Sequence, residues 1–254
     1  MSMDIQAYLD QALKAAEKAS EVILDIYHAD DFDVTLKDDN SPLTRADKAS
    51  HEVIAETLKS LGLPILSEEG KTIAYTERSN WDYFWMIDPI DGTKEFIKRN
   101  GEFTVNIALI RKGRPVLGVV RVPATGDVYH AVFSMGAFKN GQKIQVNTFD
   151  PKASGLKVVA SRSHLNDETQ AFMDDLNEPE IVSKGSSLKL LMVAEGEADL
   201  YPRYAPTMEW DTAAAQIVVE EAGGKVLQKG TQNPVVYNKE DLLNPFFLVT
   251  GISQ

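Results

Sequence analysis

Apolar residues recur at helical spacing through the first sixty residues of the chain. Between residues 4 and 28 they lie three or four positions apart, or a multiple of that, which predicts an amphipathic helix. A second pattern of this kind predicts a helix from Thr44 to Leu61. The stripe of the first helix consists of Ile5, Leu9, Leu13, Ala16, Ile23 and Ile26. We interpret the first helix as scaffold.

Strand patterns follow the two helices. Ile65 and Leu66 predict a short buried strand, and the apolar run before Asp88 predicts another. Between residues 102 and 146, apolar segments alternate with turn signals such as Asn140-Gly141, and this alternation predicts an antiparallel meander. One face of its first strand carries Phe103, Val105, Ile107 and Leu109. That face should pack against the two N-terminal helices.

The pattern changes after the polar stretch at residues 150–155. Strands are expected at 156–160 and 199–202, and helices at 167–176 and 188–195. An Ala-rich helix is expected to begin at Glu209 and to end at Gly223-Gly224. We therefore predict an α+β subdomain over residues 1–150 and an α/β subdomain over residues 151–254.

The amino-acid composition limits which metal ligands, nucleophiles and binding partners are possible. The 254 residues include no Cys, so any metal site or nucleophile must use oxygen or imidazole rather than a thiolate. A net charge of −12 disfavours a broad nucleic-acid-binding surface. No apolar run approaches the roughly 20 residues of a membrane span, and residues 1–10 lack the pattern of a signal peptide. We expect a cytoplasmic protein without an integral membrane segment; peripheral association with the inner membrane stays open.

The clearest candidate for chemistry lies where the second predicted strand ends. An apolar run delivers Asp88 and Asp91 into a turn that contains Pro89 and Gly92, and Thr93 can cap whatever follows. Two carboxylates this close repel each other unless a positive charge lies between them, and a divalent cation is the usual solution. An Asx-turn in which Asp91 only accepts backbone N–H groups is an equally good interpretation of this stretch alone.

Other acidic residues occupy similar positions, each with a structural alternative. Glu68 follows the strand at 65–66, although a Glu pair before Gly is commonly a solvated turn. Asp211 opens the Ala-rich helix, where it could be only an N-cap. Thr44 and Asp47 have the spacing of a capping box, and the spacing alone favours that local role for Asp47.

In combination and in this order, the motifs resemble the inositol monophosphatase superfamily. The Glu-Glu pair of that superfamily is matched by Ser67-Glu68-Glu69, its Asp-Pro-Ile-Asp-Gly-Thr element by residues 88–93, and its distal Trp-Asp by Trp210-Asp211. Residues 91–109, 185–189 and 200–203 are similar to one branch of it, the 3'(2'),5'-bisphosphate nucleotidases of the CysQ type. The similarity covers nearly the whole chain.

The resemblance implies a fold and a cofactor. The fold is of the α/β class with an α+β N-terminal part, a layered α/β/α/β/α sandwich of the inositol monophosphatase and fructose-1,6-bisphosphatase type. The cofactor is Mg²⁺, as two or three ions, with Mn²⁺ as a substitute; oxygen ligands suit such hard cations. The implied metal ligands are Glu68, Asp88, the Ile90 carbonyl, Asp91 and Asp211.

The resemblance also implies roles in catalysis and substrate binding. Asp47 and Thr93 would take a proton from the attacking water, and Glu68 would orient the metal that holds the nucleophile. The implied substrate-binding residues are Glu68, Ile90, Asp91, Gly92, Thr93, Gly185, Ser186, Lys189 and Asp211. For residues 185–189 the alternative is an ordinary capped helix with a solvated Lys.

The implied activity is Mg²⁺-dependent hydrolysis of adenosine 3',5'-bisphosphate to AMP and phosphate in sulfur metabolism, with 3'-phosphoadenylyl sulfate as a further substrate. One alternative is an inositol monophosphatase or related sugar-phosphate phosphatase. Another is a nucleotide-binding sensor without turnover. The complete set of carboxylates argues against a sensor. The segments 94–106 and 185–189 argue against an inositol or sugar-phosphate phosphatase.

Overall fold

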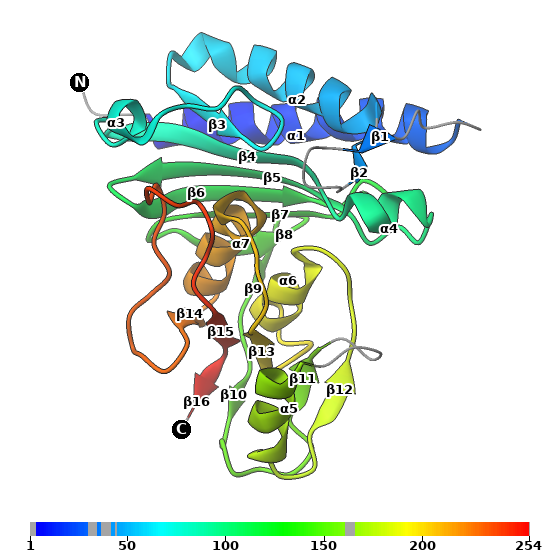
Figure 1. Ribbon diagram of the computed structural model, residues 1–254, viewed down its shortest axis with the longest axis vertical. Helices are drawn as coiled ribbons and strands as arrows, with labels where there is room; N and C mark the ends of the chain where they lie inside the picture. Colours follow the sequence, from blue (N-terminus) through cyan, green and yellow to red (C-terminus); the bar gives the residue numbers. More distant parts are fainter. Residues whose placement is uncertain (1–3, 30–34, 37–41, 44, 161–165, 254) are drawn as a thin grey trace.

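Two main sheets alternate with layers of helices in this protein (Figure 1). The computed structural model describes residues 4–29, 35–36, 42–43, 45–160 and 166–253. Helices α1 (Ile5–Tyr27) and α2 (Arg45–Leu58) cover one face of a seven-stranded sheet. Helices α6 (Leu188–Ala194) and α7 (Glu209–Glu221) lie between the two sheets, and α5 (Asp167–Asp174) covers the far side of a five-stranded sheet. The predicted α/β/α/β/α sandwich is confirmed.

Both N-terminal helices are where the apolar spacing predicts them. A 3₁₀ turn, η1 (Lys59–Leu61), continues α2. Strands β1 (Thr35–Leu36) and β2 (Pro42–Leu43) form a small antiparallel pair ahead of it. Thr44, the first residue of the predicted capping box, lies outside the described residues.

The large sheet contains the predicted meander. Its strands follow one another in space in chain order: β3 (Ile65–Ser67), β4 (Tyr83–Asp91), β5 (Thr104–Arg111), β6 (Arg114–Arg121), β7 (Val128–Val132), β8 (Gly136–Lys139) and β9 (Gln142–Ile144). Only the β3–β4 pair among these neighbours is parallel. Two short helices, α3 (Tyr75–Arg78) and α4 (Thr93–Ile97), flank β4.

Alternation along β4 decides which way its acidic end faces. Trp85 and Ile87 belong to the core beneath α1 and α2, whereas Phe84 and Met86 belong to the core between the two sheets. Side chains two residues apart share a face of a strand. Asp88 therefore continues the face of Phe84 and Met86 and faces the middle helical layer.

The second sheet has the order β12-β11-β13-β15-β14. Its strands are β11 (Lys157–Val159), β12 (Glu180–Val182), β13 (Leu200–Arg203), β14 (Lys225–Gln228) and β15 (Phe247–Thr250). Strands β11 and β13 and the three helices of this half confirm the predicted elements. The sequence patterns did not reveal β12, β14, β15 or the small parallel pair of β10 (Thr148–Phe149) with β16 (Ile252–Ser253). These strands are short, and their stability comes from distant partners rather than from local periodicity.

The middle layer joins the two halves of the chain. One apolar core draws buried side chains from β4–β8 of the first sheet, from α6 and α7, and from the second sheet. The helices contributed by residues after 150 thus cover one face of the sheet formed before 150. The division into subdomains at residue 150 stays a prediction about organisation.

Gly118 on β6 allows α7 to lie very close to the sheet. A Cβ at this position would fall 2.4 Å from the Ala214 carbonyl oxygen and 2.5 Å from Ile217 Cγ2. Both distances are far below a van der Waals contact, so any larger side chain would force the helix away from the strand. Because Asp211 lies one turn before Ala214, this contact also sets the height of Asp211 above the sheet.

We predict that Gly118→Ala lowers the free energy of unfolding by about 1–3 kcal/mol, the usual cost of overpacking. Gly118 has no positive φ, so without the clash the change would instead stabilise the protein by about 0.4–1 kcal/mol through the unfolded chain. Urea denaturation of the parent protein and of Gly118→Ala shows whether the free energy of unfolding falls or rises. An unchanged or increased stability would contradict the close approach of α7.

Candidate active site

Three carboxylates from two distant parts of the chain converge above the end of β4. Asp88 and Asp91 come from β4, and Asp211 comes from the first turn of α7. Each offers one carboxylate oxygen, and these three oxygens lie within 4.8 Å of one another. Asp88 is buried, whereas Asp91 and Asp211 are half-buried. The structure therefore brings together the two acidic motifs that lie 120 residues apart in the sequence.

Local hydrogen bonds hold the strand end in shape. The Ile90 backbone N–H donates to Asp88 Oδ1 at 3.0 Å, and Ser50 Oγ of α2 donates to the Pro89 carbonyl at 2.9 Å. Gly92 then adopts a φ of 93° immediately before α4, a conformation that glycine adopts readily. A Cβ there would also press on Ser186 Cβ at 3.1 Å. Gly92 thus permits both the turn and the close approach of the 185–187 loop.

Asp211 is the third residue of α7 rather than its N-cap, so the N-cap interpretation is wrong. Met208 occupies the N-cap position, and Asp211 Oδ2 accepts a hydrogen bond from the Met208 backbone N–H at 2.9 Å. This bond fixes one carboxylate oxygen while the side chain stays beside Asp88 and Asp91. A capping contact and a place in the acidic cluster therefore coexist in one residue.

The crowding of these carboxylates shifts their proton affinities. Burial, and then the charges of Glu68, Asp91, Asp211 and Asp47, raise the pKa of Asp88 well above its usual value. Burial, followed by the charge of Asp91, raises the pKa of Asp211 to about 8. Burial raises the pKa of Asp91 as well, although the nearby Lys189 opposes the increase. The site therefore carries unfavourable negative charge that a cation would relieve.

The donor set fits a metal cation. All the convergent groups are carboxylate oxygens, which are the ligands of hard divalent cations. Glu68 follows β3 and lies near enough for its charge to raise the pKa of Asp88 and of Asp211. Among the described residues, the three carboxylates of Asp88, Asp91 and Asp211 form the group with metal-ligand spacing. The Ile90 carbonyl oxygen lies 3.4 Å from Thr93 Oγ1 at the same strand end.

Asp47 and Thr93 meet at the edge of the acidic cluster. Thr93 Oγ1, at the start of α4, donates to Asp47 Oδ1 at 3.2 Å. Asp47 lies in the first turn of α2 and is 2% exposed. The hydroxyl thus has a buried carboxylate as its acceptor, and the charge of that carboxylate is close enough to raise the pKa of Asp88.

A cavity of about 100 Å³ opens beside Asp91 and Asp211. Two cations line it, Lys189 of α6 and Arg203 at the end of β13. Lys189 Nζ donates to the Ser186 carbonyl at 2.9 Å, and burial lowers the pKa of Lys189 although Asp91 opposes that shift. The other lining residues are Ser186, Ser187, Leu190, Tyr201, Thr207, Thr212 and Phe247.

The 185–187 loop is tied to the acidic cluster and to β5. Ser186 Oγ donates to Asp91 Oδ2 at 2.9 Å. Ser187 Oγ donates to Asn106 Oδ1 at 3.0 Å and lies 2.7 Å from Thr104 Oγ1. The Gly185 backbone N–H instead donates to Glu102 Oε2 at 2.8 Å, and Gly185 does not line the cavity.

Sequence reasoning missed several of these residues. Thr104 and Asn106 are buried polar residues within an otherwise apolar strand, and that interruption was a signal for a polar network. Arg203 is the last residue of β13 and comes directly after its apolar residues, just as Asp88 comes directly after the apolar run of β4. The signal for Tyr201 and Phe247 was absent, because alternation along a strand does not tell which cavity a side chain lines.

Comparison with known proteins agrees with this arrangement. Residues 4–246 match the model of the inositol monophosphatase family. The chain is 44% identical over 247 residues to the 3'(2'),5'-bisphosphate nucleotidase CysQ of Salmonella typhimurium, covering 95% of this chain and 99% of that protein. It is 36% identical over 253 residues to the protein of the same name from Haemophilus influenzae, covering 96% and 92% of the two chains.

Solved structures give the same result. The crystal structure of CysQ from Bacteroides thetaiotaomicron superposes with a TM-score of 0.88 at 44% identity, over 100% of both chains. The inositol monophosphatase of Anabaena superposes with a TM-score of 0.78 at 28% identity, over 99% of this chain and 93% of that one. On these grounds the chain belongs to the inositol monophosphatase family, within its CysQ branch.

Proposed function

We propose that this protein is a 3'(2'),5'-bisphosphate nucleotidase, a phosphomonoesterase that hydrolyses adenosine 3',5'-bisphosphate to AMP and phosphate in sulfur metabolism. The observation that carries the proposal is the cavity in which Asp91 and Asp211 face Lys189 and Arg203. Carboxylates suit a metal and cations suit an anionic ester, so the two sets together suit a metal-dependent phosphatase. The names of the relatives at 44% identity support the nucleotide as substrate. We include 3'-phosphoadenylyl sulfate as a second substrate.

The metal that we propose for the site is Mg²⁺, as two or three ions, with Mn²⁺ as a substitute. Asp88, Asp91 and Asp211 would hold it together with Glu68 and the Ile90 carbonyl. When bound, Mg²⁺ supplies positive charge that stabilises the phosphoryl group during displacement and makes water a better nucleophile. The residues of the chain themselves orient the ester and move the proton.

Thr93 and Asp47 have the geometry of a proton relay. In our proposal the attacking water forms a bond to phosphorus while the bond from phosphorus to the 3'-oxygen of the ribose breaks. The 3'-oxygen leaves with the electron pair of that bond and takes a proton from solvent, which gives the 3'-hydroxyl of AMP. The water proton passes to Thr93 Oγ1, whose own proton moves to Asp47 Oδ1, 3.2 Å away.

Lys189 and Arg203 would bind the anionic groups of the nucleotide. Lys189 is held by the Ser186 carbonyl, and Ser186 in turn holds Asp91, so substrate binding and the acidic cluster share one loop. An inositol or sugar phosphatase and a sensor without turnover are not favoured. Among the described residues, no helix is long and apolar enough to cross a membrane. We propose that the enzyme acts in the cytoplasm.

We predict that the purified protein with Mg²⁺ releases phosphate fastest from adenosine 3',5'-bisphosphate, with AMP as the product. Inositol 1-phosphate and fructose 1,6-bisphosphate serve as the competing substrates. Asp88→Asn should abolish turnover, yet without metal it should melt no lower than the parent protein, because one buried negative charge is removed. Faster hydrolysis of inositol 1-phosphate would favour the other branch of the family, and nucleotide binding without phosphate release would favour a sensor.

We predict that Thr93→Ala and Asp47→Asn each lower kcat by about 10²–10⁴, the usual contribution of general base catalysis. The double variant should be hardly slower than either single one, since residues of one relay are not additive. Thr93→Ser, which keeps the hydroxyl, is the matched control and should retain most of the rate. Single effects that multiply, or full kcat in Asp47→Asn, would rule the relay out.

We predict that metal-free stability falls as the pH rises towards 8. The raised pKa values of Asp88, Asp91 and Asp211 mean that the folded state binds more protons than the unfolded state between the usual carboxyl value and about 8. Stability is therefore lost as these protons leave, and Mg²⁺ should flatten the dependence by replacing them. The measurement is urea denaturation between pH 5 and 9 with EDTA or with Mg²⁺.

The control for this experiment is a pair of variants. Asp211→Asn removes one raised group and should flatten the metal-free curve, whereas Asp82→Asn at an exposed position should leave it unchanged. The result would contradict our prediction if the metal-free free energy of unfolding rose between pH 6 and 8 and Mg²⁺ made no difference. The carboxylates of the cluster would then not repel one another as described.

A further inference from the structure

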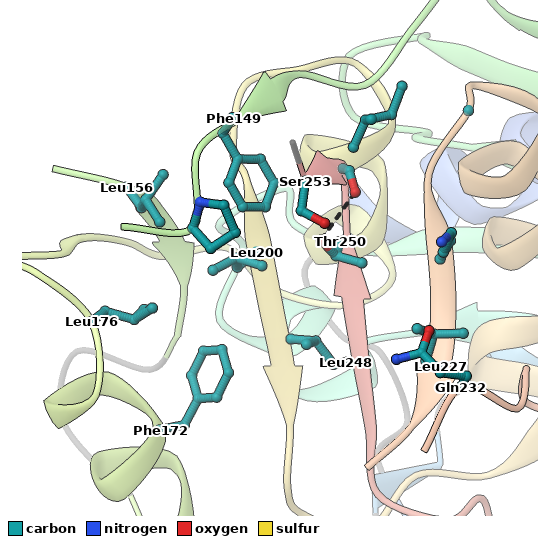
Figure 2. A pocket seen from close by; sticks show the side chains of 15 residues that line it. Phe149, Leu156, Phe172, Leu176, Leu200, Leu227, Gln232, Leu248, Thr250 and Ser253 are labelled. Atoms are coloured by element: carbon teal, nitrogen blue, oxygen red, sulfur yellow. Dashed lines mark hydrogen bonds between the residues drawn. The ribbon is translucent and has the colours of Figure 1, made fainter. Parts of the chain in front are cut away.

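A second cavity lies on the outer side of the five-stranded sheet, away from the acidic cluster. Its volume is about 350 Å³. Strands β13, β14 and β15 contribute Leu200, Leu227 and Leu248 to it. Helix α5 and the β10–β16 pair contribute further walls. Figure 2 shows the ring of Phe149 above Leu200 and the ring of Phe172 below it, with Leu248 to the right of Phe172.

The two cavities occupy opposite faces of one sheet. On β13, Leu200 lines the outer cavity and Tyr201 lines the cavity beside the acidic cluster. On β15, Leu248 lines the outer cavity and Phe247 the inner one. Neighbouring residues of a strand point to opposite faces. The outer cavity is therefore a separate compartment and not an extension of the candidate active site.

The chemistry of its wall is apolar. Eight large apolar side chains line it: Phe149, Leu156, Phe172, Leu176, Leu200, Leu227, Leu248 and Ile252. Among the polar lining residues, Thr250 donates its hydroxyl to the Gly251 carbonyl at 3.0 Å. Gln232 and Ser253 also line the cavity. Packing against such a wall stabilises a ligand in proportion to the apolar area that leaves water.

A single charge modifies this wall. Lys225, at the start of β14, is the cation among the described lining residues, which include no carboxylate. Lys225 is exposed and forms no ion pair within the described part of the chain. In a protein with a net charge of −12, a cation beside an apolar cavity that has no acidic partner among the described residues favours a ligand with a negative group.

We propose that the outer cavity binds a small amphiphile that has an apolar body about the size of two linked aromatic rings and one anionic group. The volume lies at the small end of the range for ligand pockets. The apolar body would fill the space between Phe149 and Phe172, and the anionic group would lie at the rim near Lys225. This site is independent of the nucleotide reaction, so its test does not depend on the proposed activity.

The experiment uses a pair of dyes with the same ring system. 8-Anilinonaphthalene-1-sulfonate is anionic, and N-phenyl-1-naphthylamine lacks the sulfonate; both fluoresce when they leave water. We expect the full-length protein to bind each dye saturably at one site and the anionic dye more tightly. Lys225→Ala should weaken the anionic dye by about two- to fivefold, as for an exposed ion pair, and leave the neutral dye unchanged. Lys157→Ala, on the same sheet but outside the cavity, is the matched control.

Filling the cavity gives the second arm. Leu248→Trp should remove the binding of both dyes, while its circular dichroism spectrum and urea denaturation show that the variant is folded. Adenosine 3',5'-bisphosphate with Mg²⁺ should not displace either dye. The proposal is overturned if binding is not saturable, if Leu248→Trp leaves it intact, if the nucleotide displaces the dyes, or if Lys225→Ala affects both dyes alike. Loss of dye binding as the protein concentration rises would assign the cavity to a second copy of the chain and would equally overturn it.

Discussion

The rest of the structure depends on one constraint, which is that several carboxylates at the end of β4 are held close together and largely away from water. Asp88, Asp91 and Asp211 place oxygens within 4.8 Å of one another, and burial raises the pKa of each. The charges of neighbouring carboxylates raise the pKa of Asp88 and of Asp211 further. A protein core would not keep such a cluster for stability, because replacing these groups by neutral ones would relieve the repulsion. The cluster makes physical sense as a cation site whose binding energy is released when the ion enters.

The scaffold supplies the rigidity that this charge requires. Gly118 lets α7 lie against β6, and the contact fixes the turn that carries Asp211. Ser50 of α2 holds the Pro89 carbonyl from the other side of the sheet, and Ser186 holds Asp91 from the 185–187 loop. Helix α2 and the 185–187 loop therefore both contact the end of β4 that carries Asp88 and Asp91, and β6 positions the helix that carries Asp211. Loosening any one of them would change the distances between carboxylates that a metal must bridge.

Much of this arrangement could be predicted from local sequence. The helix at 4–28, the meander and the Ala-rich helix were correctly predicted, because hydrophobic periodicity reports on elements that bury one face. The strand order β12-β11-β13-β15-β14 was not predicted, since it depends on pairings between distant segments. The outer cavity was not predicted for the same reason, because it lies between α5 and strands that no local sequence pattern places beside that helix.

The candidate active site likewise contains residues whose roles the local sequence predicts and residues whose roles it does not. Spacing alone favours a capping role for Asp47, because spacing reports only on the turn in which a residue lies. The contact with Thr93 joins residues that are 46 positions apart and needed the tertiary structure, or the resemblance to a family, to be found. The Thr104–Asn106–Ser187 network and the position of Arg203 likewise depend on how β5, α6 and β13 meet. Their polarity was visible in the sequence, but their common location was not.

The central claim is that the convergent carboxylates form a cation site. The most direct measurement is a crystal structure of the protein grown with Mn²⁺ and adenosine 3',5'-bisphosphate, with anomalous diffraction data collected at the manganese edge. The account predicts an anomalous peak between the carboxylates of Asp88, Asp91 and Asp211, and loss of that peak in crystals of Asp88→Asn. A cluster without an anomalous peak at saturating Mn²⁺, or a peak confined to another part of the protein, would contradict it.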